Sequence, residues 1–151
     1  LPAHLQSRWV DASVLPSRPL DRSTVEAAVK EEVSLYQHLF GQSPCVAVPP
    51  TFVWTEDVER AWARAGVEFV VTPGLRSSCR NAAGLPDCDR GPFYNNQPGL
   101  GVTYLVRDDY FEPERNHRAE RGLAALAQKW TQRRACLLET HRSNFIGDEA
   151  T

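Results

Sequence analysis

The stretch CVAVPPTFVWTEDVERAWARAGVEFVV, residues Cys45–Val71, decides the fold class. Its first four residues are apolar and rich in β-branched side chains, which is typical of a strand buried on both faces. The segment after Thr55 has an acidic first turn and a stripe of apolar residues, so it predicts a helix capped by Thr55 and ended by Gly66. VEFVV (Val67–Val71) predicts a second buried strand. A strand, a helix and a strand in this order predict parallel pairing through a right-handed crossover.

The flanking segments continue this alternation. DRSTVEAAVKEEVSLYQHLF predicts a helix that starts with a capping box of Ser23 and Glu26. Gly101–Val106 and Ala135–Glu139 predict two more strands. We therefore expect four neighbouring, mostly parallel strands in one sheet, as part of a larger barrel-like or open α/β fold.

The remaining segments complete the predicted organisation. Residues 1–20 have no sustained period and are expected to form an irregular arm, and residues 72–100 are expected to form a long functional loop. RAERGLAALAQKWTQ (residues 118–132) predicts a third helix. Four of its residues form the expected buried face, namely Leu123, Leu126, Ala127 and Trp130.

Size and composition indicate one domain. The chain has 151 residues and a net charge of −2, which gives no electrostatic reason to expect nucleic acid or an anionic membrane as partner. No apolar run approaches the roughly 20 residues of a membrane span, and no signal peptide opens the sequence. The chain begins at Leu1 and contains no methionine, so we interpret residues 1–151 as one α/β domain excised from a longer protein.

Two cysteines leave an alternative open. Cys79 and Cys88 flank the polar stretch RNAAGLPD and could close a small loop through a disulfide, or remain free thiols. No pair of cysteines or histidines has the spacing of a zinc finger.

Functional residues of parallel α/β folds collect beyond the carboxyl ends of the strands. That rule predicts a pocket with Trp54, Arg76, Arg107, Asp109 and Asn144 as substrate-binding residues and with His141 as the catalytic residue. Asp108, Glu112 and Arg142 lie on the same predicted loops. Aromatic, acidic and basic side chains together suit a carbohydrate. Each residue also has a structural alternative, since Asp109 fits a turn, Arg76 and Arg107 fit a charged surface, and Trp54 fits a core.

LLETHRSNFIG (Leu137–Gly147) contains the strongest candidate. His141 follows the last predicted strand and can act as an acid or a base near neutral pH. The alternation of a strand places Glu139 and His141 on the same side, so we expect the carboxylate to lie close to the imidazole. The chain has no G-x-S-x-G, P-loop or G-x-G-x-x-G motif, which argues against a serine hydrolase, an NTPase and a dinucleotide-binding protein.

Three segments resemble the polysaccharide deacetylase family, also called the NodB-homology group. They are VAVPPTFVWTEDVERAWARAGVEFVVTPG, TYLVRDDYFEPE and LLETHRSNFIG. The resemblance implies that the chain is the C-terminal portion of a longer deacetylase-like domain, which is a distorted, incomplete (β/α) barrel with mostly parallel strands. It also implies a divalent metal, zinc by expectation, and removal of acetyl groups from the amide nitrogen of sugars. His141 then corresponds to the general acid that protonates the leaving amine.

The metal-binding motifs of that family are absent from this chain. We therefore expect no metal on this chain alone and no activity of the isolated chain. The missing half would come from an upstream segment of the parent protein or from a partner chain. A second hypothesis is a non-catalytic α/β domain that binds a glycan or a protein through the same face.

Overall fold

The structure is a computed structural model that describes residues 8–11, 13–107 and 109–145. The chain divides into two compact units, a first unit of Leu1–Leu105 and a second unit of Val106–Thr151. The interpretation of the chain as one domain of a longer protein stays a prediction.

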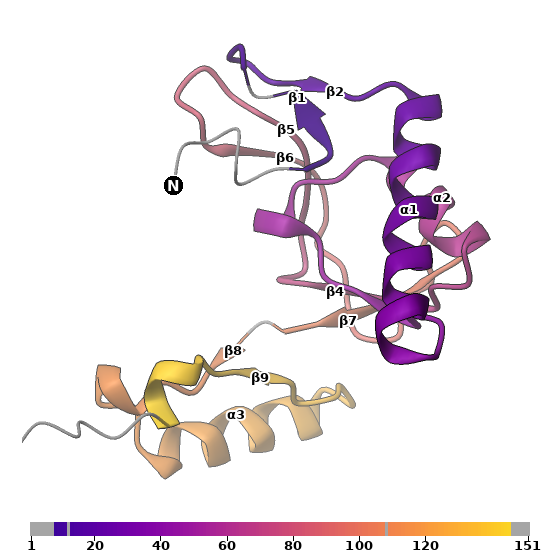
Figure 1. The fold of residues 1–151 in the computed structure, drawn as a ribbon. Helices are drawn as coiled ribbons and strands as arrows, with labels where there is room; N and C mark the ends of the chain where they lie inside the picture. The colour runs from indigo at the N-terminus through magenta and orange to yellow at the C-terminus, as the bar shows by residue number, and fades with distance from the viewer. Residues whose placement is uncertain (1–7, 12, 108, 146–151) are drawn as a thin grey trace, which may run out of the picture. The chain divides into compact units, whose positions relative to one another are not determined.

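The first unit is built around a three-stranded sheet with the strand order β3-β4-β7 (Figure 1). β3 spans Val46–Ala47, β4 spans Phe69–Thr72 and β7 spans Thr103–Val106. β3 and β4 pair in parallel, with Val46 opposite Phe69. The predicted parallel strand–helix–strand unit is therefore confirmed, although each strand is shorter than the apolar run that predicted it.

Helix α1 spans Arg22–Phe40 and begins at a different cap from the predicted one. Asp21, rather than Ser23, is the N-cap, and its carboxylate accepts a hydrogen bond from the Thr24 amide at 3.0 Å. Hydrogen bonds from Ser23 and Thr24 hold the pKa of Asp21 well below its usual value. The helix ends at Gly41, whose φ of 69° is the left-handed conformation that favours glycine.

Helix α2 spans Glu56–Arg64 and buries its apolar stripe, namely Val58, Ala61 and Trp62. Figure 1 shows it side by side with α1. Thr55 occupies the N-cap position as predicted, but its side chain makes no capping hydrogen bond. Burial of each large apolar side chain contributes roughly 1.5–3 kcal/mol. The core also contains Trp9, whose ring meets Trp62 edge to face with the ring centres 5.5 Å apart.

The segment that we expected to be a loop contains a β-hairpin instead. β5 (Arg76–Arg80) and β6 (Pro86–Arg90) pair antiparallel. The sequence signal was weak because the strands are polar, and the turn depends on Asn81, whose side chain accepts hydrogen bonds from the Ala83 and Leu85 amides. Cys79 is a free thiol, because Asp87 and not Cys88 lies opposite it in the hairpin.

The expected arm at the start of the chain also contains regular structure. β1 (Val10–Asp11) and β2 (Arg18–Pro19) form a short antiparallel pair. Ser17 ties this pair to the hairpin, since its amide donates to the Arg80 carbonyl and its hydroxyl accepts from the Arg80 amide. Residues 1–7 of the arm lie outside the described residues.

The second unit contains two short strands and a helix. β8 (Asp109–Tyr110) pairs in parallel with β9 (Leu138–Glu139). The helix α3 (Ala119–Thr131) lies between these two strands in the sequence (Figure 1). Two 3₁₀ helices, η3 (Pro113–Arg115) and η4 (Arg142–Phe145), follow the strands. The expected fourth strand therefore exists, but it pairs with β8 in a sheet separate from the three-stranded one.

The predicted buried face of α3 is wrong. Leu123, Leu126, Ala127 and Trp130 are exposed, and the buried residues of the helix are Ala125 and Lys129. The described part of the chain is thus a mixed α/β fold with parallel strand pairing and without a closed barrel. None of the helices in that part is long and apolar enough to cross a membrane.

Candidate functional site

The carboxyl ends of β8 and β9 bring Glu112 and His141 together. Tyr110 lies opposite Glu139 in the parallel register. Glu112 and His141 each lie two positions beyond the last residue of β8 and β9. The Phe111 amide donates to the Glu139 carbonyl at 2.8 Å and extends the ladder by one bond. The two short strands therefore fix the backbone from which both side chains project.

Glu112 and His141 form the centre of a polar cluster, which also includes Glu139, Asn144 and Arg107. His141 Nδ1 lies 2.5 Å from Glu112 Oε1. The Asn144 amide donates to the other oxygen, Glu112 Oε2, in a short contact. Glu112 is 3% exposed, whereas the side chain of His141 is 59% exposed, so the cluster has a buried carboxylate and an imidazole that solutes can reach.

Glu139 approaches the other side of the imidazole. Its Oε1 lies 3.7 Å from His141 Nε2, which confirms the expectation that these two side chains lie on the same side of the strand. Arg107 holds the same oxygen in an ion pair at 2.9 Å. His141 is therefore flanked by carboxylates at both ring nitrogens.

The hydrogen bond from Asn144 is the largest influence on the pKa of Glu112 and lowers it. Burial of the carboxyl opposes this effect, and the hydrogen bond from His141 adds to it, so the pKa of Glu112 lies below its usual value. Glu112 is thus ionised at neutral pH. An ionised carboxylate on Nδ1 favours the tautomer in which Nδ1 carries the proton, which leaves Nε2 to exchange a proton with a substrate.

Backbone contacts hold this geometry. The Glu112 amide donates to His117 Nδ1 at 3.0 Å, and the Glu114 amide donates to the Asn144 side-chain oxygen at 3.0 Å. Asp109 also contacts a residue of the helix, and its predicted role in substrate binding stays a prediction. Its carboxylate pairs with Arg121 of α3 at 2.9 Å, which joins the strand to the helix.

Trp54 and Arg76, the other two predicted residues, meet at a buried carboxylate in the first unit. Glu59 is fully buried and accepts hydrogen bonds from Trp54 Nε1 at 3.1 Å, from the Leu100 amide at 2.7 Å and from the Tyr104 hydroxyl at 2.9 Å. Arg76 Nη1 lies 3.6 Å from the same carboxylate. Burial and the negative charge of Glu59 raise the pKa of Tyr104 above its usual value.

The predicted site residues therefore form two clusters. Trp54 and Arg76 lie in the first unit, and Arg107, Asp109, His141 and Asn144 lie in the second unit. A shared cleft for all six residues, with His141 facing the PPTFVW loop, stays a prediction.

Glu112 was predicted at this face as a member of the loop RDDYFE, but without a role of its own. Glu59 was missing from the predicted site, because it belongs to the acidic first turn of the predicted helix. Its position between Val58 and Ala61 on the buried stripe of α2 could have identified it.

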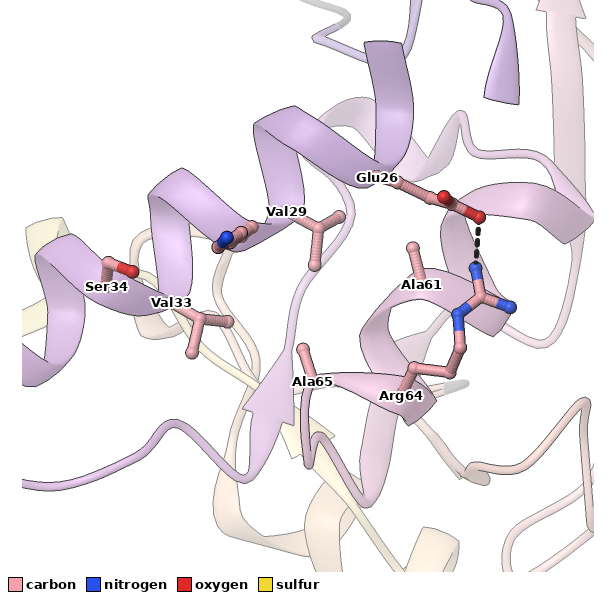
Figure 2. Close-up of a pocket in the computed structure, with 8 residues that line it drawn as sticks. Glu26, Val29, Val33, Ser34, Ala61, Arg64 and Ala65 are labelled. Carbon is pink, nitrogen blue, oxygen red and sulfur yellow. Dashed lines mark hydrogen bonds and ion pairs between the residues drawn. The ribbon is translucent and has the colours of Figure 1, made fainter. Parts of the chain in front are cut away.

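A groove between α1 and α2 is a poor candidate for chemistry. It has a volume of about 310 Å³, and Val29, Val33 and Ala61 form part of its lining. Figure 2 shows Glu26 and Arg64 pointing toward one another at its side, where they form an ion pair at 2.7 Å. The carboxylate and the guanidinium of the groove thus neutralise each other.

In the part of the chain that the structure describes, no group of three or more His, Cys, Asp or Glu residues is placed to hold a metal ion. The divalent metal of the complete protein, which the deacetylase resemblance alone implied, stays a prediction.

Comparison with known proteins corrects the assignment of the family. Residues 12–123 match the family model described as Glycosyl hydrolase family 57, whereas comparisons with curated proteins and with solved structures give no match. The resemblance to polysaccharide deacetylases is therefore wrong, and so is the amide bond as the expected target, because the matched family is named for glycoside cleavage. The motifs behind that resemblance, a proline-rich loop and a histidine at a strand end, are features that unrelated α/β proteins share. Since the match covers more than half of the 151 residues, the chain belongs to glycosyl hydrolase family 57.

Proposed function

We propose that this chain is part of a carbohydrate-cleaving protein that hydrolyses O-glycosidic bonds, and that the cluster around His141 supplies acid–base chemistry. The observation that carries the proposal is an exposed imidazole between two ionisable carboxyl groups, Glu112 and Glu139, at the carboxyl ends of two parallel strands. The family membership supports a carbohydrate substrate. We further propose that the fold is a portion of an incomplete (β/α) barrel.

Glycoside cleavage needs a proton for the leaving oxygen and negative charge beside the anomeric carbon. The transition state resembles an oxocarbenium ion, so carboxylates stabilise it and an acid completes bond cleavage. In this cluster His141 gives a proton from Nε2 to the glycosidic oxygen as the bond to the anomeric carbon breaks, and its exposed side chain can reach that oxygen. Water then adds to the anomeric carbon, and the proton that it releases returns to the imidazole. Glu139 provides the nearby negative charge.

The other members of the cluster position these two groups. Glu112 orients the imidazole through Nδ1, and Asn144 holds Glu112. Arg107 fixes Glu139 through its ion pair. A positioned acid or base typically accelerates a reaction by about 10²–10⁴-fold, and this range sets the size of the expected effects.

The test measures the release of reducing sugar ends from a panel of neutral α- and β-linked oligosaccharides. We expect His141→Ala and Glu139→Gln each to lower kcat by about 10²-fold or more. Glu120→Gln, at an exposed glutamate of α3, is the matched control and should leave kcat unchanged. Thermal unfolding of each variant shows whether it is folded.

Two results would overturn the proposal. One is full glycosidase activity in a folded His141→Ala variant. The other is release of acetate from N-acetylated sugars without any cleavage of glycosidic bonds, which would return the amide bond as the target.

A further inference from the structure

A second hollow lies in the first unit, and its lining contains none of the residues that the proposed chemistry uses. Its volume is about 270 Å³, and we call it the Arg76 hollow. Its lining includes Glu56, Arg76, Arg90, Phe93, Gln97 and Tyr104. Small-molecule pockets usually span roughly 300–1,000 Å³, so the hollow suits a single ring better than a long ligand. All of these residues lie within the part of the chain that matches the family.

Arg76 carries a hydrogen-bond donor without an acceptor. The residue is only 4% exposed, and its Nη1 and Nη2 lie 3.6 Å and 3.4 Å from carboxylate oxygens of Glu59 and Glu56. Its Nε is buried and has no hydrogen-bond partner among the described residues, since the Asp89 carboxylate lies 3.9 Å away. Buried donors in proteins are nearly always paired. Arg76 lines the hollow, and its contacts with Glu56 and Glu59 are longer than is usual for charge-assisted hydrogen bonds, so its guanidinium has donor capacity left for an acceptor that enters the hollow.

Phe93 adds an aromatic surface. Its ring stacks on Tyr104, with the ring centres 4.3 Å apart and the planes 16° from parallel. Tyr104 is itself fixed by its hydrogen bond to Glu59. Phe93 remains partly exposed and lines the hollow, so one side of the ring is held by the protein while the residue still meets solvent.

Glu56 supplies an acceptor for hydroxyl groups. Burial acts to raise its pKa, but hydrogen bonds from Arg60 and Arg76 outweigh this effect and keep the pKa below the usual value. Its side chain is 43% exposed, so the ionised carboxylate is accessible at the hollow. The positive charges of Arg76 and Arg90 are balanced by the carboxylates of Glu56 and Glu59. This balance favours a neutral ligand over a charged one.

We propose that the Arg76 hollow binds one neutral sugar unit of the substrate. A sugar ring offers hydroxyl oxygens that accept from Arg76, hydroxyl protons that donate to Glu56, and an apolar face that packs against Phe93. This inference rests on the proposed carbohydrate function and names the chemical class of ligand that the first unit selects.

Binding to the full chain tests the inference, with a neutral α-linked and a neutral β-linked glucose disaccharide as probes. Calorimetry should show saturable binding of at least one of them. Glu56→Gln and Phe93→Ala should each weaken that binding at least tenfold. Glu31→Gln, at an exposed glutamate of α1, is the matched control and should bind like the unmodified chain. Circular dichroism checks that each variant is folded, and Phe93→Leu keeps a bulky apolar side chain while removing the aromatic face.

Three outcomes would overturn the inference. They are the absence of saturable binding, unchanged binding in both folded variants, and tighter binding of a glucuronate than of the neutral sugars. None of these outcomes bears on the His141 chemistry, which is read from kcat. Conversely, unaltered turnover in His141→Ala would overturn the proposed role of His141, and sugar binding to the Arg76 hollow would still be measurable.

Discussion

Glu59 shows how one residue can order several elements. This fully buried carboxylate joins Trp54, Leu100 and Tyr104 by hydrogen bonds, and these residues come from three separate parts of the chain. Gly99 permits the close approach, because a Cβ atom at this position would lie 2.8 Å from the Tyr104 ring. A buried charge is costly unless it is paired, so the partners of Glu59 are a condition for the fold.

Glu59→Ala should therefore strongly destabilise the chain. The substitution leaves Arg76 without its buried partner and removes the acceptor of three other donors. The removal of one member of a buried pair costs about 3–5 kcal/mol. Urea denaturation measures the loss in the free energy of unfolding. Glu31→Ala on the exposed side of α1 should change that free energy by less than about 0.5 kcal/mol. Equal stability of the two variants would contradict the structural role of Glu59.

Asn144 controls the ionisation of Glu112. Because its hydrogen bond is the largest cause of the lowered pKa, Asn144→Ala should raise the pKa of Glu112 toward the ordinary 4.5. A depressed carboxyl pKa stabilises the fold above the ordinary value, and this stabilisation is lost as the pH falls through the folded-state pKa. The variant should therefore lose less stability than the unmodified chain on acidification.

An NMR titration of the side-chain carboxyl groups measures this shift directly. The side-chain carboxyl signal of Glu120, on the exposed surface of α3, serves as the internal control and should not differ between the two proteins. An unshifted Glu112 in Asn144→Ala would show that the short contact between Asn144 and Glu112 does not determine its ionisation.

At the scale of elements, the start of α1 separates two possible caps. Asp21 accepts hydrogen bonds from the Thr24 amide and from the Ser23 and Thr24 hydroxyls, whereas Ser23 lies inside the helix. Asp21→Ala should lower the unfolding midpoint because it removes the cap of the helix. Ser23→Ala should have a smaller effect, and the opposite order would restore the capping box of Ser23 and Glu26. Thermal unfolding monitored by circular dichroism compares the two variants.

The elements that the sequence predicts well are those whose burial leaves a periodic pattern. The stripe Val58, Ala61 and Trp62 predicts α2, and the apolar runs around it predict β3 and β4. The hairpin of β5 and β6 escapes prediction because its strands, RSSCR and PDCDR, are polar and are stabilised by contacts such as the one between Ser17 and Arg80. Propensity and period carry no information about such distant partners.

The same limit applies to the candidate site. The position of His141 after a strand predicts its exposure at the strand end and its closeness to Glu139, because both follow from the alternation of a strand. The contact with Glu112 depends on the pairing of β8 with β9, and the two-residue strand β8 is too short to leave a pattern. The ion pair between Asp109 and Arg121 likewise depends on how α3 packs, and no sequence pattern predicts it.

At the scale of the molecule, the two units differ in how much apolar surface they bury. The first unit encloses Trp9, Trp54, Trp62 and the valines of α2 and β4, whereas α3 of the second unit buries only Ala125 and Lys129. Segments with few buried apolar contacts open with a lower free energy than the core of a protein. The second unit should thus be the less stable of the two in solution.

Amide hydrogen exchange followed by mass spectrometry tests this difference. Peptides from α2 and β4 should exchange slowest, because opening them exposes the tryptophan core. Peptides from α3 should exchange faster, although α3 with 13 residues is longer than α2 with 9 residues and would be the better protected helix if length decided the rate. Trp62→Ala should speed exchange in α2 and β4 and leave α3 unchanged if the two units open independently. Protection of α3 equal to that of α2 would mean that its apolar face, Leu123, Leu126 and Trp130, is covered in solution.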